Sequence, residues 1–134
     1  MSDLSVAIQR AKEGSPYEGV RAAELEDVSS LDDDTVSKIQ TILDAMYWPQ
    51  LIGFGYGESD RLVAPFVVGV SREGNPLMRG YQMEGISRSG KGPGWRVFQV
   101  KNMDTVQIQG DYFDATDFQF VEYYPWLYKV VRML

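Results

Sequence analysis

Arginine and aromatic residues alternate along two short segments in the second half of the chain. Arg79 and Tyr81 are two residues apart, as are Arg96 and Phe98, and residues with this spacing share one face of a β-strand. A guanidinium beside an aromatic ring suits a phosphate with an attached base, because the guanidinium binds oxygens in pairs while the ring stacks on the base. The alternative interpretation is structural, with the rings in the core and the arginines paired with carboxylates.

The segment that joins these two pairs is rich in glycine, hydroxyls and cations. Residues 87–95 have the sequence Ser-Arg-Ser-Gly-Lys-Gly-Pro-Gly-Trp, whose successive backbone amides can form a nest for an anion. The segment is not a Walker loop, because its Gly-Lys pair is not followed by serine or threonine. The alternative is a long hairpin loop in which the glycines only allow turning. The candidate ligand-binding residues are therefore Arg79, Tyr81, Ser87, Arg88, Ser89, Lys91, Trp95 and Arg96.

The residue types that the chain lacks restrict its chemistry. It contains no cysteine and no histidine, so disulfides, thiolate chemistry and a Ser-His-Asp triad are excluded. Zinc and iron sites also depend on these residues. The sequence therefore predicts a protein that is not an enzyme and uses no cofactor.

The first fifty residues are expected to form helices. Apolar spacing predicts a helix over 4–11, and Ser15-Pro16 predicts the start of a second helix that ends near Val28. The third helix follows Asp32-Asp33-Asp34 and ends before Pro49. We attribute the acidic triplet to the positive end of this helix rather than to a metal site, because no further ligands accompany it.

From Leu51 the apolar period changes to two, which predicts strands over 51–56, 61–70, 77–83, 95–101 and 105–109. Pro65 is expected to bend the second strand. The glycines at 53, 55 and 57 are interpreted as one strand face that leaves room for a close neighbour. The predicted fold is α+β: N-terminal helices, a small five-stranded SH3-like β-barrel and an aromatic tail. One domain, 1–134, would comprise a helical segment 1–48, the barrel 51–113 and a tail 114–134 that packs on the barrel or on a second subunit.

The stretch from Leu51 to Phe113 resembles the WYL-domain family in its short stand-alone form. The matching motifs are I-x-F-x-Y from Ile52, R-x-V-x-P from Arg61, the strand 77–82 and W-R-x-F-x-V from Trp95. The resemblance implies an SH3-like or Sm-like barrel that holds ligands, in several members single-stranded nucleic acid or nucleotides. The Trp-Tyr-Leu tripeptide itself is missing, and the acidic N-terminal segment lacks a basic recognition helix, so a transcription-factor role is not implied.

Charge is divided along the chain, whose net charge is −6. Acidic residues dominate 1–60, whereas basic residues dominate from Arg72 to Lys101. This division indicates either two solvated faces of opposite sign or a basic binding surface attached to an acidic helical segment. It argues against tight non-specific binding of duplex DNA. The sequence has no apolar run long enough to span a membrane and no signal pattern at Met1, so a cytoplasmic location is expected.

Three functions follow from these observations. The favoured one is a non-catalytic module that binds a nucleotide or a short single-stranded nucleic acid. It would act as a sensor, or sequester a signalling nucleotide as small phage-encoded counter-defence proteins do. The second is a protein-interaction or inhibitor module that uses the acidic helices and the aromatic tail, with a homo-oligomer or another protein as the partner. A hydrolase using Asp or Glu with magnesium is least favoured.

Overall fold

The computed structural model describes residues 21–22, 25–84, 92–118, 127 and 129–134. Its helices are α2 (Leu25–Ser29), α3 (Asp33–Tyr47) and the 3-10 helices η1 (Val100–Asn102) and η2 (Ala115–Asp117). Its strands are β1 (Arg21–Ala22), β2 (Gln50–Tyr56), β3 (Ser59–Val70), β4 (Pro76–Glu84), β5 (Gly94–Gln99), β6 (Asp104–Tyr112) and β7 (Lys129–Met133). Among the described residues, no helix is long and apolar enough to cross a membrane.

The third predicted helix is confirmed as α3. The Asp32 carboxylate accepts hydrogen bonds at 2.8 Å from both the backbone amide and the hydroxyl of Thr35, which caps the first turn. These bonds, the backbone bond foremost, hold the pKa of Asp32 below its ordinary value of 3.8. The predicted apolar stripe faces the core, where Ile39, Leu43 and Met46 are buried.

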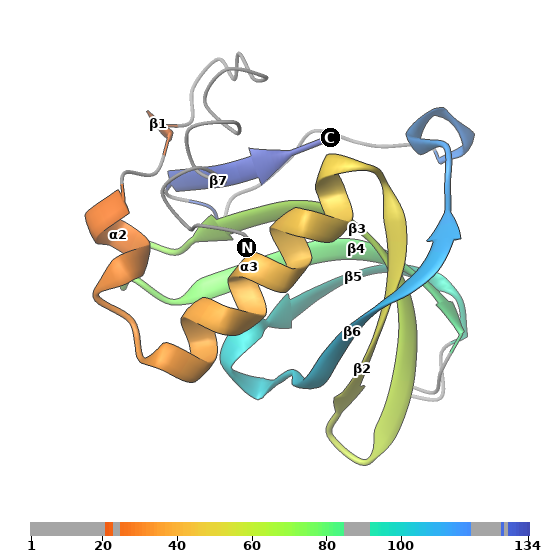
Figure 1. Ribbon diagram of the computed structural model, residues 1–134, viewed down its shortest axis with the longest axis horizontal. Helices are drawn as coiled ribbons and strands as arrows, with labels where there is room; N and C mark the ends of the chain where they lie inside the picture. The colour runs from red at the N-terminus through yellow and green to blue at the C-terminus, as the bar shows by residue number, and fades with distance from the viewer. Residues whose placement is uncertain (1–20, 23–24, 85–91, 119–126, 128) are drawn as a thin grey trace.

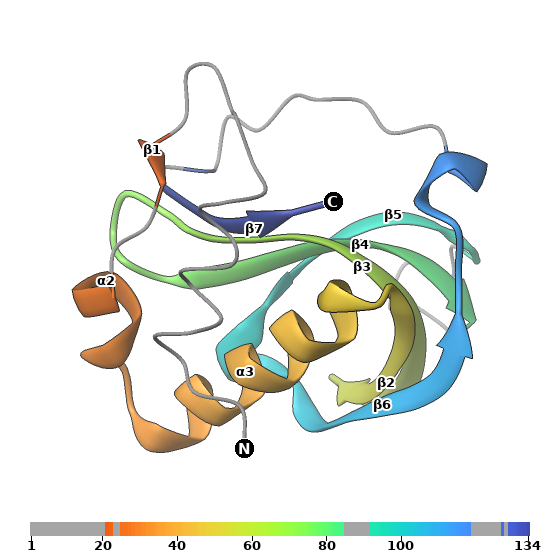
Figure 2. The ribbon, with the colours of Figure 1, turned by 45° about the horizontal axis from the view of Figure 1, so that its top comes forward.

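The described strands form one sheet in the order β1-β7-β3-β2-β6, with β4 on the other edge of β3 and β5 beyond β4. The ladders are antiparallel except for the β1–β7 pair. The sheet curves around α3 (Figures 1 and 2). No described ladder joins β5 to β6, so the sheet is not closed and the predicted barrel is not confirmed.

The long strand β3 holds the sheet together because it pairs with three others. Its first part pairs with β2, its last part with β7, and β4 runs along its opposite edge. The β3–β4 register shifts between Pro65 and Val67, where proline has no amide to donate to the ladder. The predicted irregularity at Pro65 is therefore confirmed.

Two buried clusters lie on opposite faces of this sheet. The first joins α3 to the inner face and includes Ile39, Phe54 and Phe98. The second lies on the other face and joins Phe66 to Leu127 and Val130 of the C-terminal segment. The described part of the tail thus packs on the sheet and completes its second core.

Two of the predicted boundaries were wrong. Residues 21–22 form β1 and only 25–29 form α2, where one helix to about Val28 was expected. The cause is tertiary, since β1 pairs in parallel with β7, a strand more than a hundred residues later. β5 ends at Gln99 because η1 turns the chain toward β6. The helix expected over 4–11 lies outside the described residues.

Candidate functional site

The β4–β5 ladder decides which of the predicted site residues share a face. Arg79 lies opposite Val97, Gly80 opposite Arg96, and Tyr81 opposite Trp95. Because directly opposed residues point to the same side of a sheet, Arg79 and Tyr81 share a face with Trp95. The ladder places Arg96 on the other face. The expectation of one site containing both arginines is thus corrected, because the register separates them.

Arg79 and Trp95 form a cation–π pair on their shared face. The guanidinium carbon lies 5.3 Å from the centroid of the Trp95 ring, within the range for such contacts. The Tyr81 ring stands perpendicular to Trp95, with 5.5 Å between centroids and 89° between planes. All three residues are half-buried. We call these three residues the Arg79 face.

The aromatic rings of the Arg79 face also contact the second core. Phe66 lies 4.9 Å from Trp95, and Phe118 lies 5.1 Å from Tyr81, in each case between ring centroids. The Phe66–Trp95 contact is edge-to-face and the Phe118–Tyr81 contact is tilted, and aromatic pairs of this kind stabilise the packing of the rings. The alternative prediction, in which these aromatic rings belong to the core, is therefore correct in part, because one side of each ring is packed against other residues of the protein.

The Arg96 side chain forms hydrogen bonds with the backbone of the β4–β5 hairpin. Its guanidinium donates to the backbone carbonyl of Trp95 at 2.9 Å and to that of Gly92 at 2.6 Å. A side chain at Gly94 would crowd this guanidinium, since an added Cβ would lie 2.9 Å from Nη1. Arg96 therefore holds the chain just before β5.

The loop residues Ser87, Arg88, Ser89 and Lys91 lie outside the described residues. The described chain leaves β4 at Glu84 and resumes at Gly92. Gln82 pairs with Gly94, so both ends of the connection lie at the Tyr81–Trp95 end of the hairpin. The anion nest expected there stays a prediction.

Arg61 is a buried cation that is not among the ligand-binding residues predicted from the sequence. It is 8% exposed, and it donates to the Gln82 side chain at 2.8 Å and to the Ser59 hydroxyl at 2.9 Å. A third bond of 3.3 Å reaches the carbonyl of Tyr56. These contacts make Arg61 a structural residue. Its place in the R-x-V-x-P motif was the one feature of the sequence that distinguished it from other arginines.

The described residues contain no group of three or more acidic side chains placed to hold a metal ion.

Comparison of the chain with family models, with curated proteins and with solved structures finds no match. The resemblance to the WYL family accordingly stays a prediction from its motifs.

Proposed function

We propose that this chain is a non-catalytic binding module for a nucleotide or a short single-stranded nucleic acid, bound at the Arg79 face. The observation that carries the proposal is the Arg79–Trp95 pair. A guanidinium held over an aromatic ring keeps a defined orientation, so less freedom is lost when it binds a phosphate. The Tyr81 and Trp95 rings beside it suit contact with a base.

The position of the Arg79 face on the hairpin also supports an anionic ligand. The chain enters and leaves residues 85–91 next to Tyr81 and Trp95, and this segment carries Arg88 and Lys91. Cations supplied by the loop would then add to Arg79 around the same phosphate. Arg96 contributes indirectly, by holding the end of the loop.

The proposal includes a WYL-type SH3-like architecture for the β-rich part. Supporting it are the strand order β6-β2-β3-β4-β5 and the 3-10 helix η1 between β5 and β6. A side-chain contact adds to this support, because the Tyr56 hydroxyl accepts a 3.1 Å hydrogen bond from the Gln99 amide. That bond links β2 to the end of β5. A cytoplasmic sensor or a sequestering protein is the role that we propose for such a module.

The direct test is a calorimetric screen of the full chain at low salt. Mono-, di- and cyclic nucleotides and short single-stranded oligonucleotides would be titrated in turn. We expect one class to bind, with an affinity that falls as salt rises, because phosphate contacts are screened by ions. Absence of binding by every member of the screen would overturn the proposal.

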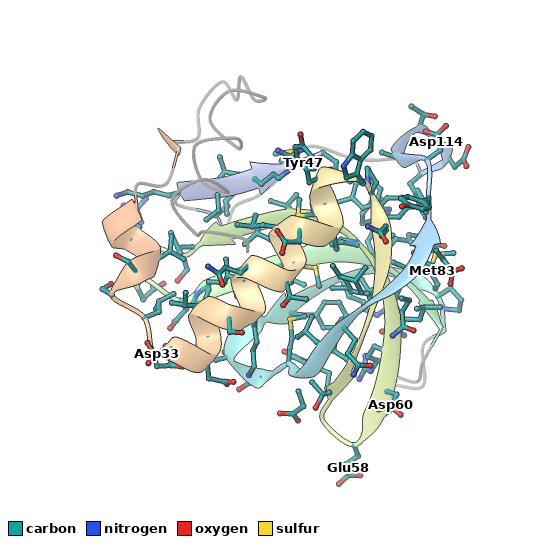
Figure 3. The ribbon with its side chains drawn as sticks, viewed as in Figure 1. Asp33, Tyr47, Glu58, Asp60, Met83 and Asp114 are labelled. Atoms are coloured by element: carbon teal, nitrogen blue, oxygen red, sulfur yellow. The ribbon has the colours of Figure 1, made fainter. Side chains whose placement is uncertain are left out.

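One observation favours the alternative function, a protein-interaction module that forms a homo-oligomer. Tyr47, Trp48 and Tyr112 are 44%, 66% and 73% exposed. Tyr47 lies at the end of α3 (Figure 3), and Tyr112 pairs with Gln50 at the adjoining start of β2. Exposed aromatic residues of this kind are enriched at protein interfaces. Light scattering of the wild type and of Trp48→Ser tests this alternative, which predicts a concentration-dependent dimer that the variant loses.

A further inference from the structure

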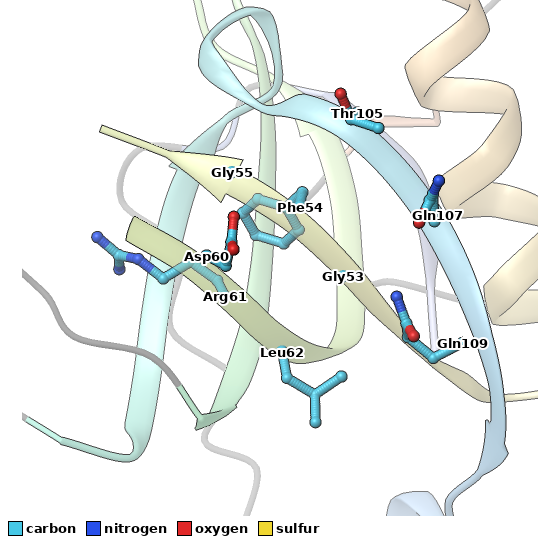
Figure 4. Close-up of a pocket in the computed structure, with 9 residues that line it drawn as sticks. All are labelled: Gly53, Phe54, Gly55, Asp60, Arg61, Leu62, Thr105, Gln107 and Gln109. Carbon is cyan, nitrogen blue, oxygen red and sulfur yellow. The ribbon is translucent and has the colours of Figure 1, made fainter. Parts of the chain in front are cut away.

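A groove of about 650 Å³ with polar and apolar lining residues lies on the outer face of β2, β3 and β6 (Figure 4). Ile52 and Phe54 of β2 are buried against the first core, so the alternate residues Gly53 and Gly55 face the other side of the sheet. The groove is lined by Gly53, Phe54, Gly55, Asp60, Arg61, Leu62, Thr105, Gln107 and Gln109.

The glycines of β2 form the floor of this groove. A Cβ at Gly53 would collide with the side-chain amide of Gln109, whereas a Cβ at Gly55 would lie 3.5 Å from the Cβ of Asp104, an ordinary contact. The end of the exposed Gln109 side chain thus lies close over the first glycine, as expected for a strand face with a close neighbour. The fold itself does not require the second glycine, because a methyl group would fit there in ordinary contact. Gly57, which was expected on the same face, instead lies in the turn after β2 with a φ of 66°.

A bulge in β6 places Thr105 on the rim. Gly53 pairs with Gln107 but Gly55 pairs with Asp104, so β6 has one residue more than β2 between these pairs. Thr105 has a φ of 51°, the one positive value among the described residues other than glycine. The bulge places Thr105 where it lines both the groove and a second hollow.

The second hollow, of about 360 Å³, makes the groove acidic. It shares Gly55, Asp60 and Thr105 with the groove and adds Glu58 and Asp104 to the lining. Glu58 and Asp60 lie at the β2–β3 turn (Figure 3), and both are exposed.

Arg61 does not offset this negative charge at the surface. It is the one basic residue among the described residues that line the two hollows. Its guanidinium is buried, however, and bonds to Gln82, Ser59 and the Tyr56 carbonyl. Figure 4 shows it directed away from the glutamines of β6.

We infer that this groove binds a basic segment of a polypeptide, with an arginine or lysine side chain on the glycine floor. The carboxylates of Asp60 and Asp104 supply the opposite charge, and the amides of Gln107 and Gln109 supply hydrogen-bond acceptors. The outer edge of β6 strengthens the choice of a polypeptide. In the described part of the chain β6 pairs only with β2, and an open edge offers backbone groups to an extended segment.

The test is fluorescence anisotropy of the full chain with a labelled peptide of alternating glycine and arginine. The double variant Asp60→Asn/Asp104→Asn should weaken binding about tenfold, because each exposed charge pair is worth a few-fold in affinity. The control Glu73→Gln/Asp117→Asn removes the same charge from exposed sites elsewhere and should change affinity less than about twofold. Gly55→Ala fits the backbone without a clash, so it should weaken binding while leaving the melting temperature unchanged.

Three outcomes would overturn the inference. Equal loss in the two double variants would mean general attraction to a negative protein. Binding of a matched glycine–glutamate peptide with the same affinity would remove the requirement for a cation. Displacement of the arginine peptide by spermidine at equal concentration would assign the groove to small polyamines instead.

Discussion

The side-chain oxygen of Gln82 lies 2.8 Å from the guanidinium of Arg61, and both residues are buried. The bond crosses from β3 to β4 close to the Val63–Gln82 register pair. Gln82 is fully buried, and a buried charge needs hydrogen-bond acceptors to remain stable in the interior. This pair therefore stabilises β4, which carries Arg79 and Tyr81 of the Arg79 face, and β3, which carries Asp60 and Leu62 of the groove.

Replacing Gln82 with leucine should destabilise the protein by about 2–3 kcal/mol, because the guanidinium loses a buried acceptor that water cannot replace. Urea denaturation followed by tryptophan fluorescence measures the free energy of unfolding. The control is Gln99→Ala at an exposed position, where we expect a change within about 0.5 kcal/mol. Similar values for both variants would contradict a stabilising role for the Arg61–Gln82 bond.

Arg79→Ala should weaken nucleotide binding by about tenfold to a hundredfold, since a charge-assisted hydrogen bond contributes about 1.5–3 kcal/mol. Arg79→Lys keeps the charge but loses the planar group that lies over Trp95, so it should restore only part of the affinity. The matched control is Arg72→Ala, which removes an exposed arginine from the β3–β4 turn. Calorimetry on the three variants decides whether Arg79 or overall charge binds the ligand.

The cap of α3 predicts a dependence of stability on pH. The Thr35 hydrogen bonds favour the charged form of Asp32 and lower its pKa below 3.8 in the folded protein. The resulting stabilisation is present above the unfolded value of about 3.8 and is lost as the pH falls through the lower, folded value. Melting temperature should therefore drop as the pH falls below about 3.8.

The variant Asp32→Asn isolates this effect, because asparagine caps a helix as well as aspartate but does not titrate. Its melting temperature should fall less than that of the wild type over the same range. The pKa of Asp114 is also lowered, by its bonds to Thr116, but that carboxyl titrates in both proteins. Equal losses in the two proteins would contradict the role of the Asp32 charge.

Deleting residues 118–134 should give insoluble or partly unfolded protein. The deletion removes β7, whose Val130 and Val131 are buried, and with it Leu127 and Phe118 of the second core. Burial of each such side chain contributes about 1.5–3 kcal/mol, so their combined loss exceeds the margin of a small domain. Circular dichroism and thermal melting report the result. A soluble truncated chain with an unchanged melting temperature would contradict it.

Much of the secondary structure follows from the sequence alone, because capping and hydrophobic periodicity are local properties. Asp32 precedes a helix with Ile39 and Leu43 on its buried face, and Pro49 ends the helical pattern. Alternation from Leu51 likewise predicts the strands to within a few residues, and Pro65 marks the irregular part of β3. These features need only neighbouring residues to form.

Only the tertiary structure decided which residues meet across strands. The register of β4 against β5 placed Arg79 beside Trp95 and turned Arg96 to the other face. A shift of that register by one residue would move every side chain of the shifted strand to the opposite face of the sheet. The register depends on the connection between the two strands rather than on the sequence of either strand alone. The glycine-floored groove and the β1–β7 pair arise in the same way. Each needs contacts between residues far apart in the chain, and local periodicity does not encode those contacts.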